Sequence, residues 1–452
     1  MNNTLKSAAM IILSTVLCLC ACDIWDSNNG GGNNDTVEPP KIWGIPGLIE
    51  FSSNDTLNHQ ITIDNDGNAF VVWVQSDDTR YNIWSKRYTD SSGWEAAQLV
   101  ENDNTGGANF PQISVDHKGN AFSVWHQTDG TRNNILANRY TAGSTWGTAV
   151  PVEYNNEGNA YRPQIAVDPN GNAITVWFQH DGTRHNIWAN RYTEGSGWGT
   201  AQLIETGSYD ATGSIIAVDP NGNAFAVWRQ YDGTMYNIWS NRYTVGSGWG
   251  TAQLIENDNS GNADVPQIAV DHDGNAIVVW KLFDGTRSNI WTNRYTMGSG
   301  WGTVQLIETD DEGNAYEPQI AVDPNGNAIV VFYQYDGIKL NIKTNRYTAG
   351  SGWGTPELIE TNDEENAYNP QIAINSDSNA IAVWRQNDGT RYNIWANRYT
   401  AGSGWGTAEL IETDDTGDAE DPQIAFDNEG NAIAVWRQFD GSYYSIYACR
   451  YE

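Results

Sequence analysis

The sequence predicts an all-β fold, an eight-bladed β-propeller of four-stranded antiparallel blades, and three observations carry this prediction. One pattern recurs along the chain, and the residue that ends its second segment steps by 52, 52, 51, 52, 52, 52 and 52 positions. Each copy holds four segments of strand length, rich in β-branched and aromatic residues. The last copy lacks its fourth segment, and a matching segment precedes the first copy. The eight marker residues are Trp73, Trp125, Trp177, Trp228, Trp280, Phe332, Trp384 and Trp436.

The third copy shows why each segment is expected to be a strand. Residues 163–168 and 172–179 are joined by Asp-Pro-Asn-Gly, in which Asp accepts local N–H groups, Pro presets φ and Gly takes a positive φ. Residues 186–192 alternate bulky side chains on both faces, and residues 201–205 complete the copy. We therefore expect each sheet to pack between two neighbours, with the marker tryptophans filling the space between blades.

The two ends of the repeat region predict a closed ring. Residues 43–50 align without gaps to residues 405–412, the fourth segment of the seventh copy, and the chain stops at Glu452 after a third segment. An N-terminal strand that completes the last blade leaves no blade edge unpaired. An open solenoid would instead need atypical capping repeats.

Composition excludes some partners. The formal net charge is −32 at pH 7, so nucleic acid is a poor partner because its phosphates would be repelled. The charge is explained by a solvated acidic surface, by bound divalent cations or by adaptation to a saline habitat. A monomer is expected.

The N-terminus resembles a bacterial lipoprotein signal. An apolar stretch at residues 8–19 ends in Leu-Cys-Ala-Cys, which resembles a lipobox. The resemblance implies a signal peptide at residues 1–21 and lipid on Cys22. The polar composition that follows predicts a flexible tether at residues 22–42, and the repeat places the propeller at residues 43–452. The expected location is the bacterial cell envelope, facing the periplasm or the cell surface, with the membrane contacted through the lipid alone. An ordinary secretory signal is the alternative. Cys449 is left without a disulfide partner.

One face of the ring is expected to carry the loops before each first strand and after each second strand. The second-strand loops repeat Asp-Gly-Thr-Arg, and three interpretations stay open: aspartates that cap their own turns, calcium in the neighbouring acidic loops, or repeated sugar sites built from Asp, Arg and an aromatic ring. The ligand-binding candidates are Asp129, Arg132, Asp181, Arg184, Trp188, Asp284, Arg287, Asp388, Arg391 and Trp395. The calcium candidates are Asp103, Asp258, Asp310 and Asp414, and no other cofactor is expected.

An arginine occurs once in every third strand, on the face that carries isoleucine. A residue shared by all blades indicates a structural role, so we expect these arginines to lie between blades, each paired with a carboxylate. They are Arg87, Arg139, Arg191, Arg242, Arg294, Arg346, Arg398 and Arg450.

The organisation of residues 43–452 resembles the sialidase-like and lectin-like propeller superfamily and the bacterial repeat lipoproteins within it. Residues 114–119 approach the sialidase Asp-box but are one residue too long and lie between the first and second strands. Gly402-Ser403-Gly404-Trp405 is similar to a turn of fucose-type propeller lectins. The resemblance implies carbohydrate binding.

Three functions follow as hypotheses. The first is a non-catalytic, lipid-anchored propeller that binds carbohydrate or another surface ligand through repeated loops. The second is a protein-interaction scaffold in the cell envelope. The third is a sialidase-like glycoside hydrolase, which would need an asymmetric set of an arginine triad, a Tyr/Glu pair and an Asp acid.

Overall fold

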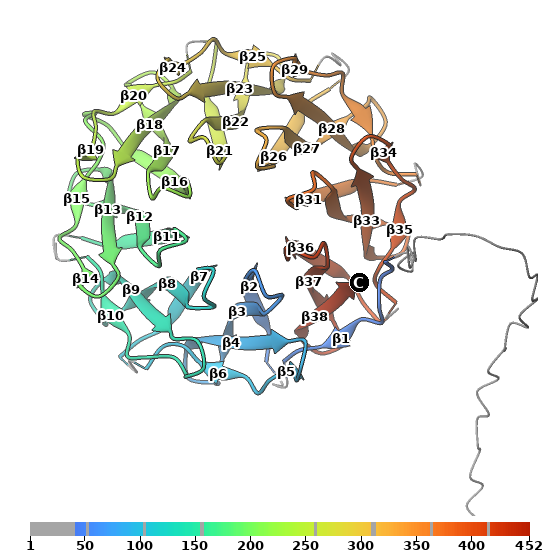
Figure 1. The fold of residues 1–452 in the computed structure, drawn as a ribbon, viewed down its shortest axis with the longest axis horizontal. Helices are drawn as coiled ribbons and strands as arrows, with labels where there is room; N and C mark the ends of the chain where they lie inside the picture. Colours follow the sequence, from blue (N-terminus) through green and yellow to red (C-terminus); the bar gives the residue numbers. More distant parts are fainter. Residues whose placement is uncertain are drawn as a thin grey trace, which may run out of the picture. The chain divides into compact units, whose positions relative to one another are not determined.

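Eight antiparallel sheets stand in a ring, which confirms the predicted propeller (Figure 1). The space at the centre of the ring is lined by side chains of all eight blades, and we call it the channel. The structure, a computed structural model, describes residues 41–50, 54–102, 105–153, 158–256, 260–308, 313–361, 365–413 and 416–452. The strands nearest the channel are β2 (Thr56–Ile63), β7 (Ala108–Val115), β11 (Ala160–Val167), β16 (Ala211–Val218), β21 (Ala263–Val270), β26 (Ala315–Val322), β31 (Ala367–Ile374) and β36 (Ala419–Phe426). We number the blades 1 to 8 in this order.

The second and third strands of each blade follow outward from the channel. The second strands are β3 (Ala69–Ser76), β8 (Ala121–Thr128), β12 (Ala173–His180), β17 (Ala224–Tyr231), β22 (Ala276–Phe283), β27 (Ala328–Tyr335), β32 (Ala380–Asn387) and β37 (Ala432–Phe439). The third strands are β4 (Tyr81–Thr89), β9 (Asn133–Tyr140), β13 (His185–Thr193), β18 (Tyr236–Thr244), β23 (Ser288–Thr296), β28 (Leu340–Thr348), β33 (Tyr392–Thr400) and β38 (Tyr444–Tyr451).

The outermost strand differs from expectation because in six blades it is split into two short pieces that both pair with the third strand. Asn190 shows the reason: its side-chain amide donates to the carbonyl of Gly199, at 3.1 Å, and to that of Val152 in the preceding blade, at 2.7 Å. The side chain thus takes a place in the backbone ladder and joins two blades. The pieces are β5 (Gly93–Trp94) and β6 (Gln98–Leu99), β14 (Gly197–Trp198) and β15 (Gln202–Leu203), β19 (Gly248–Trp249) and β20 (Gln253–Leu254), β24 (Gly300–Trp301) and β25 (Gln305–Leu306), β29 (Gly352–Trp353) and β30 (Glu357–Leu358), and β34 (Gly404–Trp405) and β35 (Glu409–Leu410), with β10 (Val150–Pro151) alone in blade 2.

The N-terminal strand closes the ring as predicted. Strand β1 (Gly47–Leu48) pairs antiparallel with β38, and in Figure 1 it lies along the outer edge of the last blade. The backbone N–H of Gly44 donates to the carbonyl of Arg450 at 2.7 Å, and the indole of Trp43 lies 5.4 Å from the ring of Tyr451. The last blade therefore has its full set of four strands.

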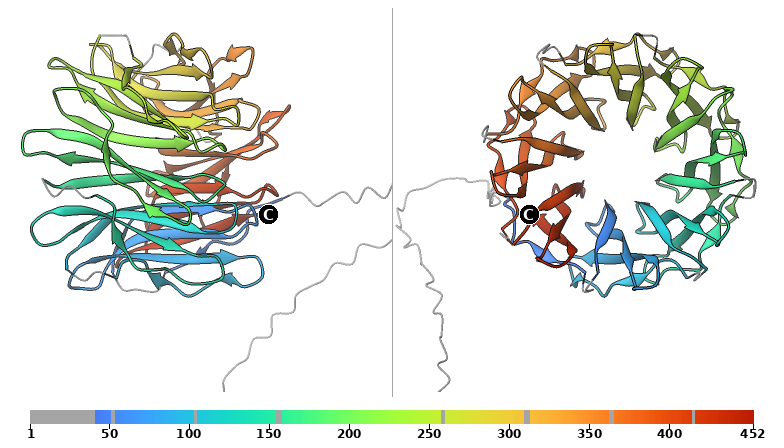
Figure 2. Two further views of the ribbon diagram at one scale, coloured as in Figure 1. Left: turned by 60° about the vertical axis from the view of Figure 1, so that its left-hand side comes forward. Right: turned by 180° about the vertical axis from the view of Figure 1, so that it is seen from behind.

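The hydrophobic core lies between neighbouring blades, which Figure 2 shows packed face to face around the ring. Trp228 of blade 4 is fully buried and packs with Val176, Ile187 and Ile204 of blade 3. The same arrangement recurs around the ring, and seven marker tryptophans are at most 1% exposed. The prediction that these tryptophans pack between blades is confirmed.

A buried polar connection accompanies this core. The indole N–H of Trp228 donates to the Oε1 of Gln230 at 2.9 Å, and the Nε2 of Gln230 donates to the Oε2 of Glu205 in blade 3 at 3.0 Å. Glu205 is 2% exposed, and burial raises its pKa above the ordinary value. Glutamine therefore serves both a buried donor and a buried acceptor across the interface.

The repeated third-strand arginines lie between blades, as expected, but within the described ranges a carboxylate partner is found for only some of them. Arg139 pairs with Glu194 of blade 3 at 2.9 Å. Arg242 instead donates to the hydroxyl of Thr244 at 3.0 Å and lies 5.7 Å from the ring of Tyr295 in the next blade. Among the described residues the expectation of a carboxylate in every blade is wrong, because the position of Glu194 varies between blades: in blade 5 it is Met297, whose sulfur accepts from Arg242 at 3.7 Å.

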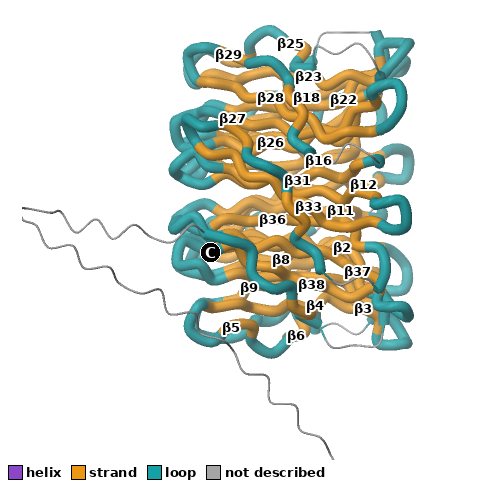
Figure 3. Tube along the Cα trace, turned by 90° about the vertical axis from the view of Figure 1, so that its right-hand side faces the viewer, coloured by secondary structure: helices purple, strands orange, loops and turns teal. Residues whose placement is uncertain are grey.

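Loops gather at the two faces of the ring, as the side view shows (Figure 3). The turns between second and third strands lie at the same face as the beginnings of the first strands, since the strands are antiparallel. Among the described residues, no helix is long and apolar enough to cross a bilayer.

Candidate functional site

The Asp-Gly-Thr-Arg loops are self-contained turns. The Oδ1 of Asp181 accepts the backbone N–H of Thr183 at 2.8 Å, its hydroxyl at 2.6 Å and the N–H of Arg184 at 2.9 Å. Its Oδ2 accepts the amide of Asn186 at 2.9 Å. These bonds, led by that of the Thr183 hydroxyl, hold the pKa of Asp181 well below its usual range. The turn-capping interpretation is confirmed, and the equivalent contacts recur at Asp129, Asp284 and Asp388.

The other ligand-binding candidates also have structural contacts. Arg184 turns inward to Glu205, with 3.3 Å between Nη2 and Oε1. Trp188 and Trp395 are half-buried and pack against the cores between blades. The ten candidates belong to blades 2, 3, 5 and 7, and none of them lines the cavity described next. Their role in binding stays a prediction.

The proposed calcium aspartates Asp103, Asp258, Asp310 and Asp414 and the proposed lipidation site Cys22 lie outside the described residues. Within the described ranges, no group of three or more His, Cys, Asp or Glu side chains could hold a metal ion.

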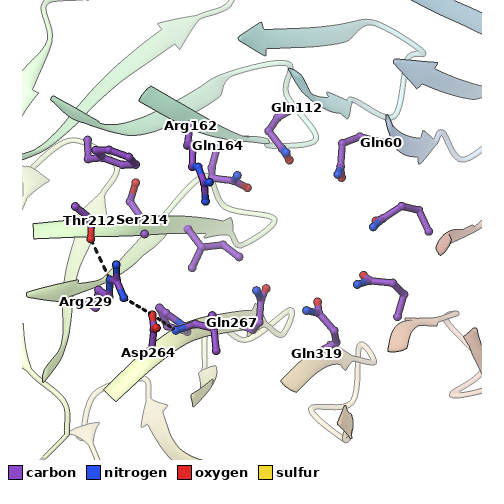
Figure 4. A pocket seen from close by; sticks show the side chains of 17 residues that line it. Gln60, Gln112, Arg162, Gln164, Thr212, Ser214, Arg229, Asp264, Gln267 and Gln319 are labelled. Atoms are coloured by element: carbon purple, nitrogen blue, oxygen red, sulfur yellow. Dashed lines mark hydrogen bonds and ion pairs between the residues drawn. The ribbon is translucent and has the colours of Figure 1, made fainter. Parts of the chain in front are cut away.

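A cavity of about 730 Å³ opens at the centre of the ring (Figure 4). Seven blades contribute the glutamine of their Pro-Gln or His-Gln pair, and blade 4 contributes Ile215 instead. Figure 4 shows the labelled glutamines turned toward the open centre. We call them the glutamine ring; its members are Gln60, Gln112, Gln164, Gln267, Gln319, Gln371 and Gln423.

Every first strand carries a β-bulge next to this ring. In β11 the pairing with β12 shifts between Tyr161 and Gln164, and Arg162 in the bulge has a φ of 47°. A positive φ is uncommon for residues other than glycine, yet it recurs in all eight blades. We call these residues the bulge ring, and the end of the channel that they surround is the channel mouth. The bulge ring consists of Asn58, Phe110, Arg162, Gly213, Val265, Glu317, Asn369 and Asp421.

The blades differ from one another at the channel mouth. Beside each bulge, one residue of the first strand pairs in register with one residue of the second strand. The second-strand residue is the unshared position between the marker aromatic and the following Gln or Leu. These pairs are Leu57 and Val74, Asn109 and His126, Tyr161 and Phe178, Thr212 and Arg229, Asp264 and Lys281, Tyr316 and Tyr333, Tyr368 and Arg385, and Glu420 and Arg437.

The arginines of the chain fall into three groups by their place in the repeat. Eight lie at the repeated third-strand position and five in the turns after the second strands. The remaining four lie at the channel mouth: Arg162, Arg229, Arg385 and Arg437. The sequence signal for this site is variation within a faithful repeat, which a search for shared motifs passes over.

Ion pairs fix several of these side chains. Glu420 bridges two blades, with its Oε1 3.0 Å from Arg385 and its Oε2 2.7 Å from Arg437. Arg229 pairs with Asp264 of blade 5 at 2.8 Å. Burial raises the pKa of Glu317, against the opposing charge of Arg385. The mouth is thus a set of charges held in fixed positions.

Aromatic side chains lie in two rows beside these charges. The first row crosses blades 2 and 3 and the second crosses blades 6 and 7, with ring centroids 5.3 to 5.8 Å apart between neighbours. Burial, together with the charge of Arg162, lowers the pKa of His126 to about 4. The first row is Phe110, His126, Tyr161 and Phe178, and the second is Tyr316, Tyr333 and Tyr368.

Comparison with known proteins finds similar structures but no similar sequence. No protein-family profile matches the chain. No curated protein matches its sequence. A polysaccharide lyase of family PL25, an ulvan lyase solved with bound -[GlcA(1-4)Rha3S]-, is similar with a TM-score of 0.53 and 11% identity, covering 90% of this chain and 95% of that one. The polysaccharide lyase Uly1 has a TM-score of 0.50 and 10% identity, covering 87% and 89%. A protein of unknown function from Dyadobacter fermentans has a TM-score of 0.45 and 12% identity, covering 78% and 96%.

At these identities the likeness shows the fold alone. The Hadza microbial sialidase Hz136, with a TM-score of 0.39, and a GH93 alpha-L-arabinofuranosidase of Fusarium graminearum, with a TM-score of 0.42, are also among the structural neighbours.

Proposed function

We propose that this propeller binds carbohydrate at the channel mouth. The observation that carries the proposal is the convergence of the unshared positions of the repeat on one place. A scaffold that repeats its core, its turns and its interblade contacts varies the bulge residues and the strand pairs beside them, and Arg162, Arg229 and Asp264 of this set line the central cavity.

The chemistry of the mouth suits sugars. Planar aromatic rings stack on the apolar faces of pyranose rings, while arginine and carboxylate groups form directional hydrogen bonds to hydroxyl groups. The glutamine ring adds amide donors and acceptors at the floor of the cavity. The ulvan lyase of similar fold has been solved with a carbohydrate bound, which supports this assignment.

The site proposed here differs from repeated sites in the Asp-Gly-Thr-Arg loops, and blade 7 offers a matched pair of variants. Arg385 lies at the mouth and Arg391 in the turn that follows, six positions later. We expect Arg385→Gln to weaken binding of a glycan-array ligand by about tenfold or more and Arg391→Gln by less than about twofold. The reverse order of effects would place the site in the loops. No binding to any glycan on the array would contradict the function itself.

A second candidate is a carbohydrate-cleaving enzyme at the same site. Side chains with displaced pKa values gather there, among them Glu317, raised by burial, and His126, lowered to about 4. Such displaced groups are typical of proton-transfer sites. Incubating each bound glycan with the protein and following chain length and the absorbance of unsaturated uronate ends separates binding from cleavage.

We also propose that the lipobox-like sequence ending at Cys22 anchors the protein in the bacterial envelope. Metabolic labelling with a palmitate analogue, compared between the natural chain and Cys22→Ala, tests this proposal.

A further inference from the structure

Blade 4 departs from the other seven at the channel mouth. Where those blades carry a side chain on the bulge residue, followed by Pro-Gln or His-Gln, blade 4 has Gly213-Ser214-Ile215. Gly213 has a φ of 66°, so the backbone makes the same bulge without a side chain. Ile215 also removes one amide from the glutamine ring. The wall of the cavity therefore lacks a bulge side chain at Gly213, and we call this place the blade 4 gap.

Two arginines flank this gap, and Figure 4 shows both on the wall of the cavity. Arg162 projects from the bulge of blade 3; it is exposed, lies 4.7 Å from the ring of Phe110 and has no carboxylate partner among the described residues. Arg229 is held by its neighbours: Nε donates to the Thr212 hydroxyl at 3.0 Å and Nη1 pairs with Asp264 at 2.8 Å.

A buried hydroxyl lies at the same place. Ser214 is 7% exposed, lines the cavity, and its Oγ has no hydrogen-bond partner within the described ranges. A buried polar atom without a partner is costly, and such an atom in a cavity wall indicates a ligand group that completes it. Serine also supplies a backbone N–H that proline lacks in six of the other blades.

We propose that the blade 4 gap is a subsite for an oxyanion carried by the carbohydrate ligand, either a uronic acid carboxylate or a sulfate ester. This inference rests on the proposed carbohydrate-binding function. Arginine guanidinium groups recognise carboxylate and sulfate through paired, charge-assisted hydrogen bonds, and Ser214 adds a neutral donor. Because the formal net charge is −32, the protein as a whole repels anions, so attraction must come from cations at short range.

The first test variant places a side chain at the bulge of blade 4, using a residue type that occupies the same position in other blades. Asn58 and Asn369 occupy the bulge in blades 1 and 7 with φ values of 51° and 50°, so Gly213→Asn places a side chain at blade 4 in a conformation that asparagine adopts elsewhere in this ring. Asn369→Gly is the matched control, since it opens the equivalent position in blade 7. Arg162→Gln is an independent variant that removes the unpaired cation and leaves the bulge residue polar.

Binding is measured by calorimetry with three oligosaccharides: a uronic acid oligomer, the same oligomer with its carboxylates reduced to alcohols, and a sulfated neutral oligomer. We expect the natural protein to bind one anionic oligomer at least about tenfold more tightly than the reduced one, and Gly213→Asn and Arg162→Gln each to remove this preference. The preferred oligomer identifies carboxylate or sulfate. Asn369→Gly should leave the ratio between the affinities for the anionic and the reduced oligomer unchanged within about twofold, whatever its effect on the affinity for all three oligomers.

The outcomes separate the two proposals. Equal affinity of the natural protein for anionic and reduced oligomers, or an anionic preference that survives both variants, overturns the subsite but leaves carbohydrate binding in place. Failure of the natural protein to bind any of the three oligomers, or any glycan on an array, overturns both.

Discussion

Replacing Gln230 by leucine tests whether the buried polar connection between blades contributes to stability. Gln230 accepts the indole N–H of Trp228 at 2.9 Å and donates to Glu205 at 3.0 Å. All three side chains are at most 2% exposed. Leucine fits a similar volume without either bond, and blade 5 already carries Leu282 at this position. Gln230→Leu therefore removes the connection from one interface only.

The magnitude follows from the two bonds. A hydrogen bond to a charged group contributes about 1.5 to 3 kcal/mol, and a buried N–H left without an acceptor costs about 1 to 3 kcal/mol. The greater apolar area of leucine offsets about 1 kcal/mol. We expect a net loss of about 3 kcal/mol in the free energy of unfolding, or a fall in Tm of about 3 to 4 °C for a domain of this size.

Gln334→Leu in blade 6 is the matched control. Phe332 replaces the marker tryptophan there, so this substitution removes the bond to Glu308, at 3.0 Å, but leaves no indole unsatisfied. Its cost should be smaller by about 1 to 3 kcal/mol. Urea unfolding followed by tryptophan fluorescence, with calorimetry for Tm, measures both variants. Costs that agree within about 0.5 kcal/mol would refute the contribution of the indole bond.

Three further predictions concern titration, ring closure and backbone packing. Burial raises the pKa of Glu153 to about 7, so the folded state holds a proton that the unfolded state releases, and the free energy of unfolding falls as pH rises from about 4.5 to 7. Glu153→Gln does not titrate, so its free energy of unfolding should rise relative to that of the natural protein by about 1 to 3 kcal/mol across this pH range. A difference between the two proteins that stays constant with pH would contradict the raised pKa. Burial raises the pKa of the Cys449 thiol to about 12, so the native protein should resist a thiol reagent, whereas deletion of residues 41–50 should expose the thiol; equal labelling rates would mean that the N-terminal strand does not cover it. A Cβ on Gly261 would lie 1.8 Å from a backbone carbonyl oxygen of β22, so Gly261→Ala should lower the free energy of unfolding by about 2 kcal/mol or more. Gly47 has open space around it, so Gly47→Ala should change the free energy of unfolding by less than about 0.5 kcal/mol, and urea unfolding measures both variants.

The repeat alone was sufficient for the fold. A fixed step between marker tryptophans gives the number of blades, and the transfer of one strand from the end to the beginning of the repeat region gives closure. Both are properties of sequence order, because each blade is a local antiparallel sheet whose strands follow one another along the chain. The burial of Trp228 and its equivalents follows from the same order, since a sheet with two bulky faces needs a neighbour on each side.

The candidate site could not be predicted from the repeat as the fold was. The shared Asp-Gly-Thr-Arg loops are the most conspicuous polar motif of the repeat, yet the carboxylate of Asp181 is used within its own turn. Whether a polar side chain faces its own backbone or an open cavity depends on local conformation, which a motif does not state.

The sequence by itself determined the closed ring of eight blades, because period and phase act through neighbours along the chain. Only the tertiary structure decided where the blades differ in a way that matters. Arg162 and Arg229 lie 67 positions apart and belong to different repeats, and ring closure with the bulged first strands brings them to one cavity beside Gly213. Residues that look like scattered variation along the chain become neighbours because eight first strands converge on a single axis.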